Sequence, residues 1–508
     1  MLRVIPSLGL MLVVLAACSS ALPEYPRSQS FAPVPPANTR LAADVRGLGN
    51  PGDGRSGVNL IANGEYALAA RLLLAARADV TLDAQYYLLH DDPTGHIFAS
   101  SLLNAADRGV RVRLLLDDMD TSGYDAMTAA LDSHENIEIR LFNPFRRDQS
   151  LFVAGLTDFK RINRRMHNKS LTADNTISIV GGRNIGAEYF LAKEEMNYAD
   201  LDIMVAGPVV KEVSDNFDDY WNSAFAVPAR AVIGEPEQFG LQDARVRLNA
   251  LVAEAQQTPY AAALRRSAEA HFKRSALKLD WVPAKLYSDP PTKAAGAANG
   301  VPILASKLVP YFQNAEESVN VVSAYFVPRR SGVKWLSELE GRGVDVTVTT
   351  NSLASNDVAP VYAHYALQRR PLLESGVELH ELRPDAHRVH RRGVNWGESR
   401  SGLHTKAFTV DNRYLFVGSF NWDPRSVHIN TEMGILVDSP LITKRAVDVL
   451  DGFLLENTYA VRLEDDRLTW RAQGDDGVTV VYRNEPTGSF WGHIKAGLLA
   501  ILPIGSQL

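Results

Sequence analysis

The sequence predicts an α/β protein made of two duplicated domains, with an active site where the two domains meet. Helix and strand patterns alternate along both halves of the chain, and one five-residue motif occurs in each half at a constant offset. A chain of 508 residues is also too long for a single hydrophobic core. The constant offset favours two large halves over three smaller domains.

The repeated motif consists of His, Lys, Asp, Gly and Asn at fixed spacing. The two copies are His167, Lys169, Asp174, Gly181 and Asn184, and His404, Lys406, Asp411, Gly418 and Asn421. Every pair differs by 237 positions, since 404 − 167 and 421 − 184 both equal 237. A single His-x-Lys is typical of a solvated surface, whereas five residues that repeat in register predict a catalytic half-site present twice.

The helix and strand patterns begin near Asn59. In the first half we predict a helix over 65–77, a strand over 80–88, a helix over 96–108 and a buried strand over 111–116. In the second half we predict a strand over 318–326, a helix over 333–341 and a strand over 344–350. This order is typical of βαβ units, so we expect largely parallel sheets covered by helices.

Each motif predicts a strand, a tight turn and a second strand. Residues two apart on a strand face the same side, so the His and Lys of each copy should point together. An Asp-Asn pair, 174–175 or 411–412, should then reverse the chain into a second apolar strand. The glycines that follow allow a tight exit that brings the asparagine of each motif back beside the His and Lys.

Such a constellation suits phosphoryl-group chemistry without a metal or a cofactor. Histidine can attack phosphorus or protonate a leaving oxygen because its unperturbed pKa, about 6.5, lies near working pH. A lysine ammonium and an asparagine amide can donate to the non-bridging oxygens. One histidine cannot be nucleophile and acid at once, but two copies supply both roles. The predicted catalytic set is His167, Lys169, Asp174, His404, Lys406 and Asp411, with the two aspartates more consistent with structural groups at their turns than with acid-base catalysts.

The paired motifs resemble those of the phospholipase D superfamily, and from about Leu82 onward the chain is similar to the bacterial cardiolipin synthase C group. The finer signature lies at 141–145, 164–170, 181–186 and 350–357. The resemblance implies two phospholipase D-like α/β/α sandwich domains with the active site at their interface. It also implies a two-step reaction through a covalent phosphohistidine.

The resemblance further implies a role for each motif residue. His167 would attack the phosphodiester, and His404 would protonate the departing alkoxide and then deprotonate the incoming alcohol. The reverse assignment of nucleophile and acid remains open. The remaining phosphate-binding and supporting groups would be Lys169, Lys406, Asn184, Asn421 and Ser419.

An acidic residue should orient each imidazole. Residues 430–433 align with 198–201, each followed by an apolar strand and a proline, which pairs Glu432 with Asp200. The alignment needs five extra residues in the first copy, since 432 − 200 is 232 and not 237. Glu195 stands at the unshifted offset and is the alternative to Asp200.

The chain divides into five predicted regions. Residues 1–18 resemble a lipoprotein signal peptide whose lipobox cysteine, Cys18, would be lipidated; the alternative is a small buried hydrophobic residue. Residues 19–58, rich in Pro, Ser and Gly, predict a tether. Residues 59–236 and 303–508 would be the two phospholipase D-like domains, joined by a variable linker region at 237–302.

Composition bounds the partners. A net charge of −6 gives no support for broad nucleic-acid binding.

From the resemblance we expect a phosphatidyltransferase that makes cardiolipin from phosphatidylglycerol and a second phospholipid, with phosphatidylethanolamine as a candidate. Hydrolysis of the same intermediate is the alternative. The enzyme would be lipid-anchored in a bacterial envelope and face the periplasm, with the membrane and any protein partner left open.

Other features carry weaker predictions. Tyr86, Tyr87 and Tyr325 end strands near the expected site. They would serve either as packing residues or as contacts to the substrate. Arg164 and Arg165 would meet a lipid headgroup or be solvated. The segment 385–400, rich in His and Arg, favours a headgroup-binding lid over a metal site. The apolar stretch 494–502 would be a docking helix or an interfacial helix.

Overall fold

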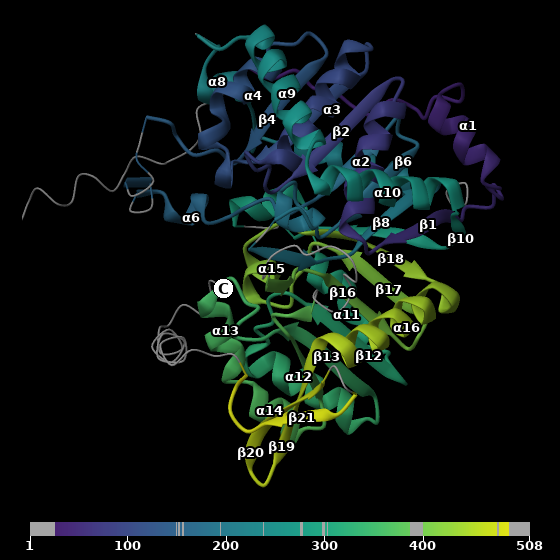
Figure 1. Cartoon of the computed structure of the whole chain (residues 1–508), viewed down its shortest axis with the longest axis vertical. Helices are drawn as coiled ribbons and strands as arrows, with labels where there is room; N and C mark the ends of the chain where they lie inside the picture. Colours follow the sequence, from purple (N-terminus) through teal and green to yellow (C-terminus); the bar gives the residue numbers. More distant parts are fainter. Residues whose placement is uncertain are drawn as a thin grey trace, which may run out of the picture.

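The computed structural model describes residues 26–486 except for 149, 151–152, 155–156, 194, 237, 275–277, 297–299, 302, 387–399 and 475–476. Cys18 and the predicted signal peptide, most of the His-rich segment and the stretch 494–502 therefore lie outside the described residues. The described chain forms two halves, stacked along the long axis in Figure 1, and each half is built around one large sheet.

The first half alternates helices and strands up to β10. Its elements are α1 (Arg40–Gly47), β1 (Ser56–Ile61), α2 (Gly64–Arg77), β2 (Thr81–Tyr86), α3 (Pro93–Asp107), β3 (Arg111–Asp117), α4 (Asp125–Asp132), β4 (Ile137–Phe142), α6 (Phe159–Ile162), β5 (Ser170–Ala173), β6 (Ile177–Gly181), η3 (Ala187–Phe190), β7 (Met196–Ala199), β8 (Asp202–Ala206), α7 (Pro208–Trp221), β9 (Ala226–Pro228), α8 (Ala229–Ile233), α9 (Leu241–Gln256), α10 (Pro259–Arg274) and β10 (Asp280–Val282).

The second half has a similar order of elements. Its elements are β11 (Ala284–Ser288), α11 (Leu304–Gln313), β12 (Ser318–Ser323), α12 (Arg329–Gly341), β13 (Asp345–Asn351), α13 (Ala359–Ala366), α14 (Arg369–Glu374), β14 (Glu378–Leu382), β15 (Arg400–Leu403), β16 (Lys406–Val410), β17 (Tyr414–Gly418), α15 (Pro424–His428), β18 (Met433–Asp438), α16 (Pro440–Asn457), β19 (Thr458–Glu464), β20 (Arg467–Gln473) and β21 (Thr479–Tyr482).

The two large sheets share one strand order. The first runs β10-β1-β8-β6-β5-β2-β3-β4-β9, and the second runs β11-β18-β17-β16-β12-β13-β14-β19-β20-β21. Eight consecutive strands correspond, from β1 and β11 at one end to β9 and β19 at the other. The prediction of two duplicated α/β domains is confirmed, and the predicted helices and strands agree with the observed ones to within a few residues at their ends.

The expectation of largely parallel sheets is wrong. Only β2-β3-β4 and β12-β13-β14 pair in parallel within these sheets, and their other described pairs are antiparallel. The parallel strands are those joined by helices, as βαβ units require. The motif strands β5-β6 and β16-β17 are instead joined by two-residue turns at 174–175 and 411–412, where all four residues have positive φ, so these pairs must be antiparallel.

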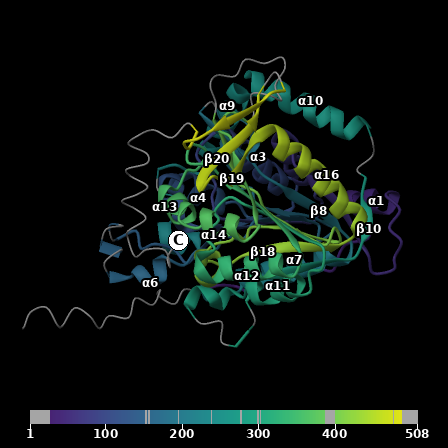
Figure 2. The ribbon, with the colours of Figure 1, turned by 90° about the horizontal axis from the view of Figure 1, so that it is seen from below.

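Helices cover both faces of the second sheet, and an apolar layer joins the two halves. In Figure 2, α16 lies on one side of the strands and α11 and α12 lie on the other. The layer between the halves contains Val180 and Ile203 from the first half and Val417, Met433 and Ile435 from the second, all buried. Because this layer lies beside the ends of the motif hairpins, it fixes the two motifs relative to each other.

Two segments outside the predicted domains are ordered where they are described. Part of the predicted tether lies on the first half, where Arg27 donates to the carbonyl of Ala224 and Ala32 N donates to Asp218. The predicted linker contributes α9 and α10, which pack on α3 and α2, and one edge strand to each sheet. In the described part of the chain, every helix is too short or too polar to cross a bilayer.

Candidate active site

Backbone pairing between the halves places both motifs at one junction. Strand β15 pairs in parallel with β7, and His404 N donates to the carbonyl of Ala199 over 2.8 Å. In the other copy, Met166 pairs with Thr431, and His167 N donates to the Thr431 carbonyl over 2.9 Å. Each histidine therefore follows a backbone contact with the opposite half.

These contacts give each imidazole a carboxylate from the other half. His167 Nδ1 lies 2.9 Å from Glu432 Oε2, and His404 Nδ1 lies 2.6 Å from Asp200 Oδ2. The structure thus places Asp200, and not the alternative Glu195, at the His404 imidazole. The contact of Glu195 with the second half is through its backbone carbonyl, which accepts the Arg400 amide. The acid and the base of each pair come from different halves, so neither half contains a complete pair.

The hydrogen bonds to Nδ1 fix the tautomer of both histidines. His167 Nδ1 also lies 3.1 Å from the Ser419 carbonyl, which can only accept, so Nδ1 carries the proton. His404 Nδ1 faces Asp200, a carboxylate whose pKa is lowered by His404 against the opposing effect of burial. In both rings Nε2 is then the unprotonated nitrogen, available to attack or to accept a proton.

Small residues after the second motif strand let the carboxylates approach. A Cβ at Gly182 would overlap the Asp200 carboxylate, and a Cβ at Gly418 would overlap the Met433 carbonyl. At the position equivalent to Gly182, Ser419 donates its hydroxyl to Glu432 over 2.5 Å. The glycines and the serine are therefore required by the close packing of the acid partners.

The motif lysines lie under their histidines. Lys169 Nζ donates to the His167 carbonyl and Lys406 Nζ to the His404 carbonyl, each over 2.6 Å. One carbonyl occupies one of the three donors of an ammonium, so each lysine keeps donors for a phosphate oxygen. The rings of Tyr87 and Tyr325 lie 5.2 and 5.8 Å from these two Nζ atoms.

The motif asparagines are held by equivalent backbone contacts. Asn184 Oδ1 accepts the Leu88 amide over 3.3 Å, and Asn421 Oδ1 accepts the Tyr325 amide over 3.4 Å. Asn184 Nδ2 donates to the Tyr189 hydroxyl. Because Oδ1 is occupied in both copies, the amide Nδ2 groups are the ends available as donors to an anion.

Burial controls the charge state of the histidines and lysines. Burial, followed by the Lys169 and Lys406 ammonium groups, lowers the pKa of His167 well below its usual value. Burial and Lys406 lower the pKa of His404 to about 4, although Asp200 favours the charged form. Both imidazoles are therefore neutral at pH 7.

The groups around the imidazoles titrate closer to neutrality. Burial lowers the pKa of Lys406 to about 8, against the opposing carboxylates. Burial raises the pKa of Glu432 to about 7, against the attraction of Lys169. A bound phosphodiester anion would stabilise the ammonium and imidazolium forms, so substrate binding prepares the site for proton transfer.

All four side chains are buried, and the imidazoles are slightly less buried than the lysines. His167 keeps 8% and His404 6% of its surface exposed, whereas Lys169 and Lys406 keep 1% each. The pKa of His167 is also lowered by His404, so the two rings lie close enough to interact electrostatically. The two rings are thus the groups of the motifs that a substrate would reach before the lysines.

Asp174 and Asp411 do not belong with the reacting groups. Asp174 accepts the amides of Asp79, Val80 and Thr81, and Asp411 accepts those at 316–318. These bonds attach each motif turn to the start of the neighbouring strand. Both carboxylates are occupied by backbone amides at the turns, as expected for structural groups rather than acid-base catalysts.

Arg165 is neither a headgroup ligand nor solvated. It is fully buried, forms an ion pair with Asp117 at 3.1 Å and donates to the carbonyl of Asn143. Arg164 lies nearer the surface and donates to the Lys293 carbonyl over 3.3 Å. Tyr86 is also buried and its hydroxyl accepts a hydrogen bond from an arginine, so it is a packing residue. Its neighbour Tyr87 differs, because the ring of Tyr87 lies beside Lys169.

Sequence reasoning missed three residues at the site. The rings of Tyr189 and Tyr198 lie 4.9 and 5.3 Å from the His404 ring. Asp357, which is exposed, accepts the hydroxyls of Tyr198 and Tyr325 at 3.0 Å each and so connects the two halves. Strand periodicity could have indicated Tyr198, two residues before Asp200, but no local pattern indicated Tyr189 or Asp357 as site residues.

Outside the motifs, one group among the described residues has the geometry of a metal site. Ligand atoms of His90, Asp92 and Glu188 lie within 4.8 Å of one another. Asp92 caps α3 through the amides of Thr94 and Gly95 and also accepts the Ala187 amide. Because both of its oxygens accept backbone amides, the position of Asp92 is explained by its role as a helix cap.

Comparisons with known proteins agree with this geometry. The family model described as cardiolipin synthase, PLD-like domain, matches residues 71–221 and 308–453. Cardiolipin synthase C of Escherichia coli K12 is 41% identical over 92% of this chain and 99% of its own length. Cardiolipin synthase A of Pseudomonas syringae is 25% identical over 77% of this chain and 67% of its own. In fold, the crystal structure of phosphatidylserine synthase from Haemophilus influenzae is similar, with a TM-score of 0.55, 14% identity, and coverage of 83% of this chain and 91% of that one.

Proposed function

The chain belongs to the phospholipase D-like cardiolipin synthase family, and on this premise we propose that it is a phosphatidyltransferase that joins a phosphatidyl group to phosphatidylglycerol, giving cardiolipin. One structural observation carries the proposal. Two imidazoles, one from each motif, each lie against a carboxylate of the other half that leaves Nε2 unprotonated. That arrangement supports a reaction in which one ring is the nucleophile and the other moves the proton.

In the first half-reaction, His167 Nε2 attacks the phosphorus of the donor phospholipid. The new P–N bond replaces the P–O bond to the headgroup alcohol, which leaves as the free alcohol after taking a proton from His404 Nε2. His404 is neutral in the empty site, so this step requires the anionic phosphodiester to raise its pKa. Lys169, Lys406 and the two asparagine amides would hold the non-bridging oxygens.

In the second half-reaction, the alcohol of an acceptor phosphatidylglycerol attacks the phosphohistidine. His404, unprotonated after the first step, takes the proton from the attacking hydroxyl. The P–N bond breaks, a P–O bond forms, and His167 returns to its neutral state. The same intermediate with water as acceptor would give phosphatidic acid, which is the hydrolytic alternative.

The identity of the donor is part of the proposal. The relative with 41% identity is a cardiolipin synthase, which supports phosphatidylglycerol as a substrate. The second phospholipid is either another phosphatidylglycerol or phosphatidylethanolamine. Donor choice would appear in the alcohol released, glycerol in the first case and ethanolamine in the second.

The test is a product analysis with purified protein. We would supply phosphatidylglycerol labelled in its acyl chains, with and without phosphatidylethanolamine, and identify the labelled lipids and the released alcohol. We expect labelled cardiolipin, and loss of all product in His167→Ala. Phosphatidic acid as the sole product would contradict the synthase and support the hydrolase. A phosphopeptide centred on His404 instead of His167 would reverse the assignment of nucleophile and acid.

We also propose that Cys18 carries a lipid that keeps the enzyme at a membrane facing the periplasm. The proposal rests on the apolar run and the small residues before Cys18. Metabolic labelling with palmitate, followed by membrane fractionation, would test it. We expect label and membrane attachment in the natural protein and the loss of both in Cys18→Ala; label retained by the variant would contradict the anchor.

A further inference from the structure

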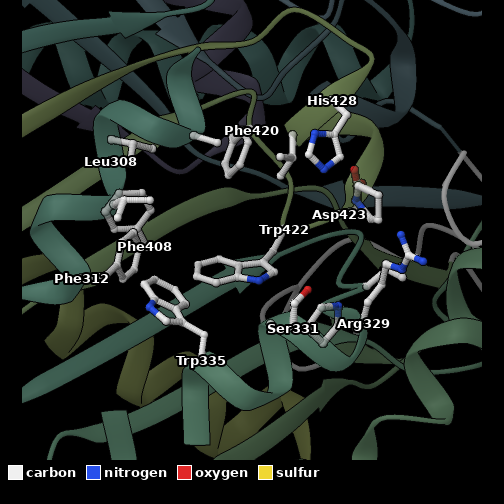
Figure 3. A pocket seen from close by; sticks show the side chains of 17 residues that line it. Leu308, Phe312, Arg329, Ser331, Trp335, Phe408, Phe420, Trp422, Asp423 and His428 are labelled. Atoms are coloured by element: carbon white, nitrogen blue, oxygen red, sulfur yellow. The ribbon is translucent and has the colours of Figure 1, made fainter. Parts of the chain in front are cut away.

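A deep apolar cavity lies beside the second motif and takes no part in the mechanism above. Its volume is about 310 Å³, which falls at the lower end of the range for small-molecule pockets, about 300–1,000 Å³. Its walls come from α11, α12, β16 and the segment after the second motif. Figure 3 shows an aromatic interior around Phe312, Trp335 and Trp422, whose ring centroids lie 5.2–5.6 Å apart.

The rim of this cavity carries one arginine and one histidine. Arg329, which begins α12 with a φ of 53°, and His428 of α15 are both exposed and stand on the same side of the cavity in Figure 3. Among the described residues, Arg329 has no carboxylate within ion-pair distance. The carboxylate in the lining, Asp423, accepts the Ser426 amide over 2.6 Å as the cap of α15. An apolar interior with an unpaired cation at its rim suits an amphiphile with an anionic head.

The cavity is connected to the reacting groups through the motif itself. Phe420 and Trp422 line it and flank Asn421, and Trp422 is fixed by a bond from its amide to Ser323 Oγ. On the opposite side, Ser426 of α15 donates to Glu432, the acid partner of His167. A molecule in the cavity would therefore contact the residues on either side of Asn421, a member of the proposed phosphate cradle.

The first half has a different side chain at one position equivalent to the cavity wall. The offset of 237 places Arg183 where Phe420 stands in the second half. Arg183 is buried and donates to the carbonyls of Ile61 and Tyr189. The two copies of the duplicated fold therefore differ here, with a buried and hydrogen-bonded arginine in the first half and a cavity-lining phenylalanine in the second.

We propose that this cavity is the acceptor subsite, holding an acyl chain of the phospholipid whose hydroxyl attacks the phosphohistidine, with the unreacting phosphate of that lipid at Arg329. The proposal rests on the proposed function and deepens it. The donor phosphate must lie between the two imidazoles, so a cation outside that cradle fits a second phosphate, which only the acceptor carries. The cavity is also lined by residues that flank Asn421 in the motif of His404, the group that deprotonates the acceptor.

The first test measures how the covalent intermediate divides between two acceptors. The full-length enzyme receives labelled phosphatidylglycerol in mixed micelles with a fixed concentration of ethanol, and we measure the ratio of cardiolipin to phosphatidylethanol. Ethanol has neither chain nor phosphate and needs no acceptor subsite. Val309, 37% exposed on α11, and the half-buried Ala305 line the cavity, so Val309→Trp and Ala305→Trp fill it from outside the core.

We expect both tryptophan variants and Arg329→Gln to lower this ratio at least about tenfold, with phosphatidylethanol formation kept within about threefold of the natural protein. The matched control is Arg330→Gln, which removes the neighbouring exposed charge outside the cavity lining and should leave the ratio unchanged. An unchanged ratio in the filled and Arg329 variants overturns the subsite. A parallel fall of both products also overturns it, because the cavity would then serve the donor. A natural protein that makes phosphatidylethanol but no cardiolipin contradicts the proposed function instead.

The second test detects the chain directly. Phosphatidylglycerol with brominated acyl chains should quench Trp335 and Trp422 when it binds to the full-length His167→Ala protein, which cannot turn it over. We expect the quenching to fall by more than half in Trp335→Phe plus Trp422→Phe. Equal quenching with and without these two tryptophans would place the chain elsewhere and overturn the proposal.

Discussion

At the two reacting imidazoles, the proton on Nδ1 decides what Nε2 can do. Both Nδ1 atoms face an acceptor from the opposite half, so both Nε2 atoms are free in the resting site. Glu432 is further held by the hydroxyls of Ser419 and Ser426, while Asp200 accepts the amide of Leu201. These hydrogen bonds restrict the orientation of each carboxylate. Each carboxylate in turn holds its imidazole so that Nε2 points at the phosphorus.

Replacing either carboxylate by its amide should remove activity and preserve the fold. In Glu432→Gln and Asp200→Asn the amide can donate to Nδ1, which favours the wrong tautomer, so we expect kcat to fall roughly a thousandfold. Steady-state kinetics and single-turnover formation of the phosphohistidine measure this effect. Glu195→Gln is the matched control, since that side chain is exposed and is the alternative given by the repeat offset. Loss of activity in Glu195→Gln with activity retained in Asp200→Asn would contradict the assignment.

The pH dependence should follow Glu432 and Lys406. Glu432, with a pKa of about 7, accepts from the imidazole only when ionised, so kcat/KM should rise with pH through about 7. Lys406, with a pKa of about 8, binds phosphate only when protonated, so kcat/KM should fall as pH rises through about 8. Lys406→Arg keeps its charge at every accessible pH and should lose the descending limb, whereas Lys444→Arg on the exposed face of α16 should keep it. A descending limb that persists in Lys406→Arg would show that another group produces it.

At the scale of the elements, each motif aspartate attaches a turn to a strand. Asp174 is fully buried and accepts three consecutive amides at the start of β2. Asp174→Ala leaves these amides without acceptors, so we expect the free energy of unfolding to fall by about 3 kcal/mol. Denaturant unfolding measures this change, and activity per folded molecule should stay within a few-fold of the natural protein.

The equivalent residue of the second half serves as the comparison for Asp174. Asp411 makes the same bonds, but they lie at an exposed turn, where water can replace the lost acceptor. Asp411→Ala should therefore cost less stability than Asp174→Ala. A selective loss of kcat in either variant, without a loss of stability, would return the aspartates to the reacting set.

The sequence was sufficient for the elements and their duplication, because helix and strand periodicity is local and the motif repeats in register. Local patterns could not show the antiparallel outer strands, which depend on which strands meet after the chain has folded. They also misplaced Arg165, since a charged residue beside a motif suggests a surface site until its partner Asp117, 48 positions away, is known. The crossing of each histidine to the acid of the other half was likewise invisible, because it is set by the packing of the two sheets.

At the scale of the whole molecule, activity depends on the apolar layer between the halves. It is formed by side chains such as Val180, Ile203 and Val417, all buried, and it lies beside the motif hairpins. Because His167 depends on Glu432 and His404 on Asp200, any separation of the halves removes both acid partners together. The site is therefore intact only while the layer is closed.

A charge placed in this layer should test that dependence. Val417→Asp buries a carboxylate among valines and isoleucines, at a cost of about 3 kcal/mol or more. We expect a loss of transferase activity together with two resolved unfolding transitions where the natural protein has one, because each half keeps its own sheet and core. Calorimetry and the product assay measure these changes, and Val449→Asp, at a position 67% exposed on α16, is the matched control. Full activity in a folded Val417→Asp protein would mean that the imidazoles do not need the opposite half, and the proposed arrangement of the active site would be wrong.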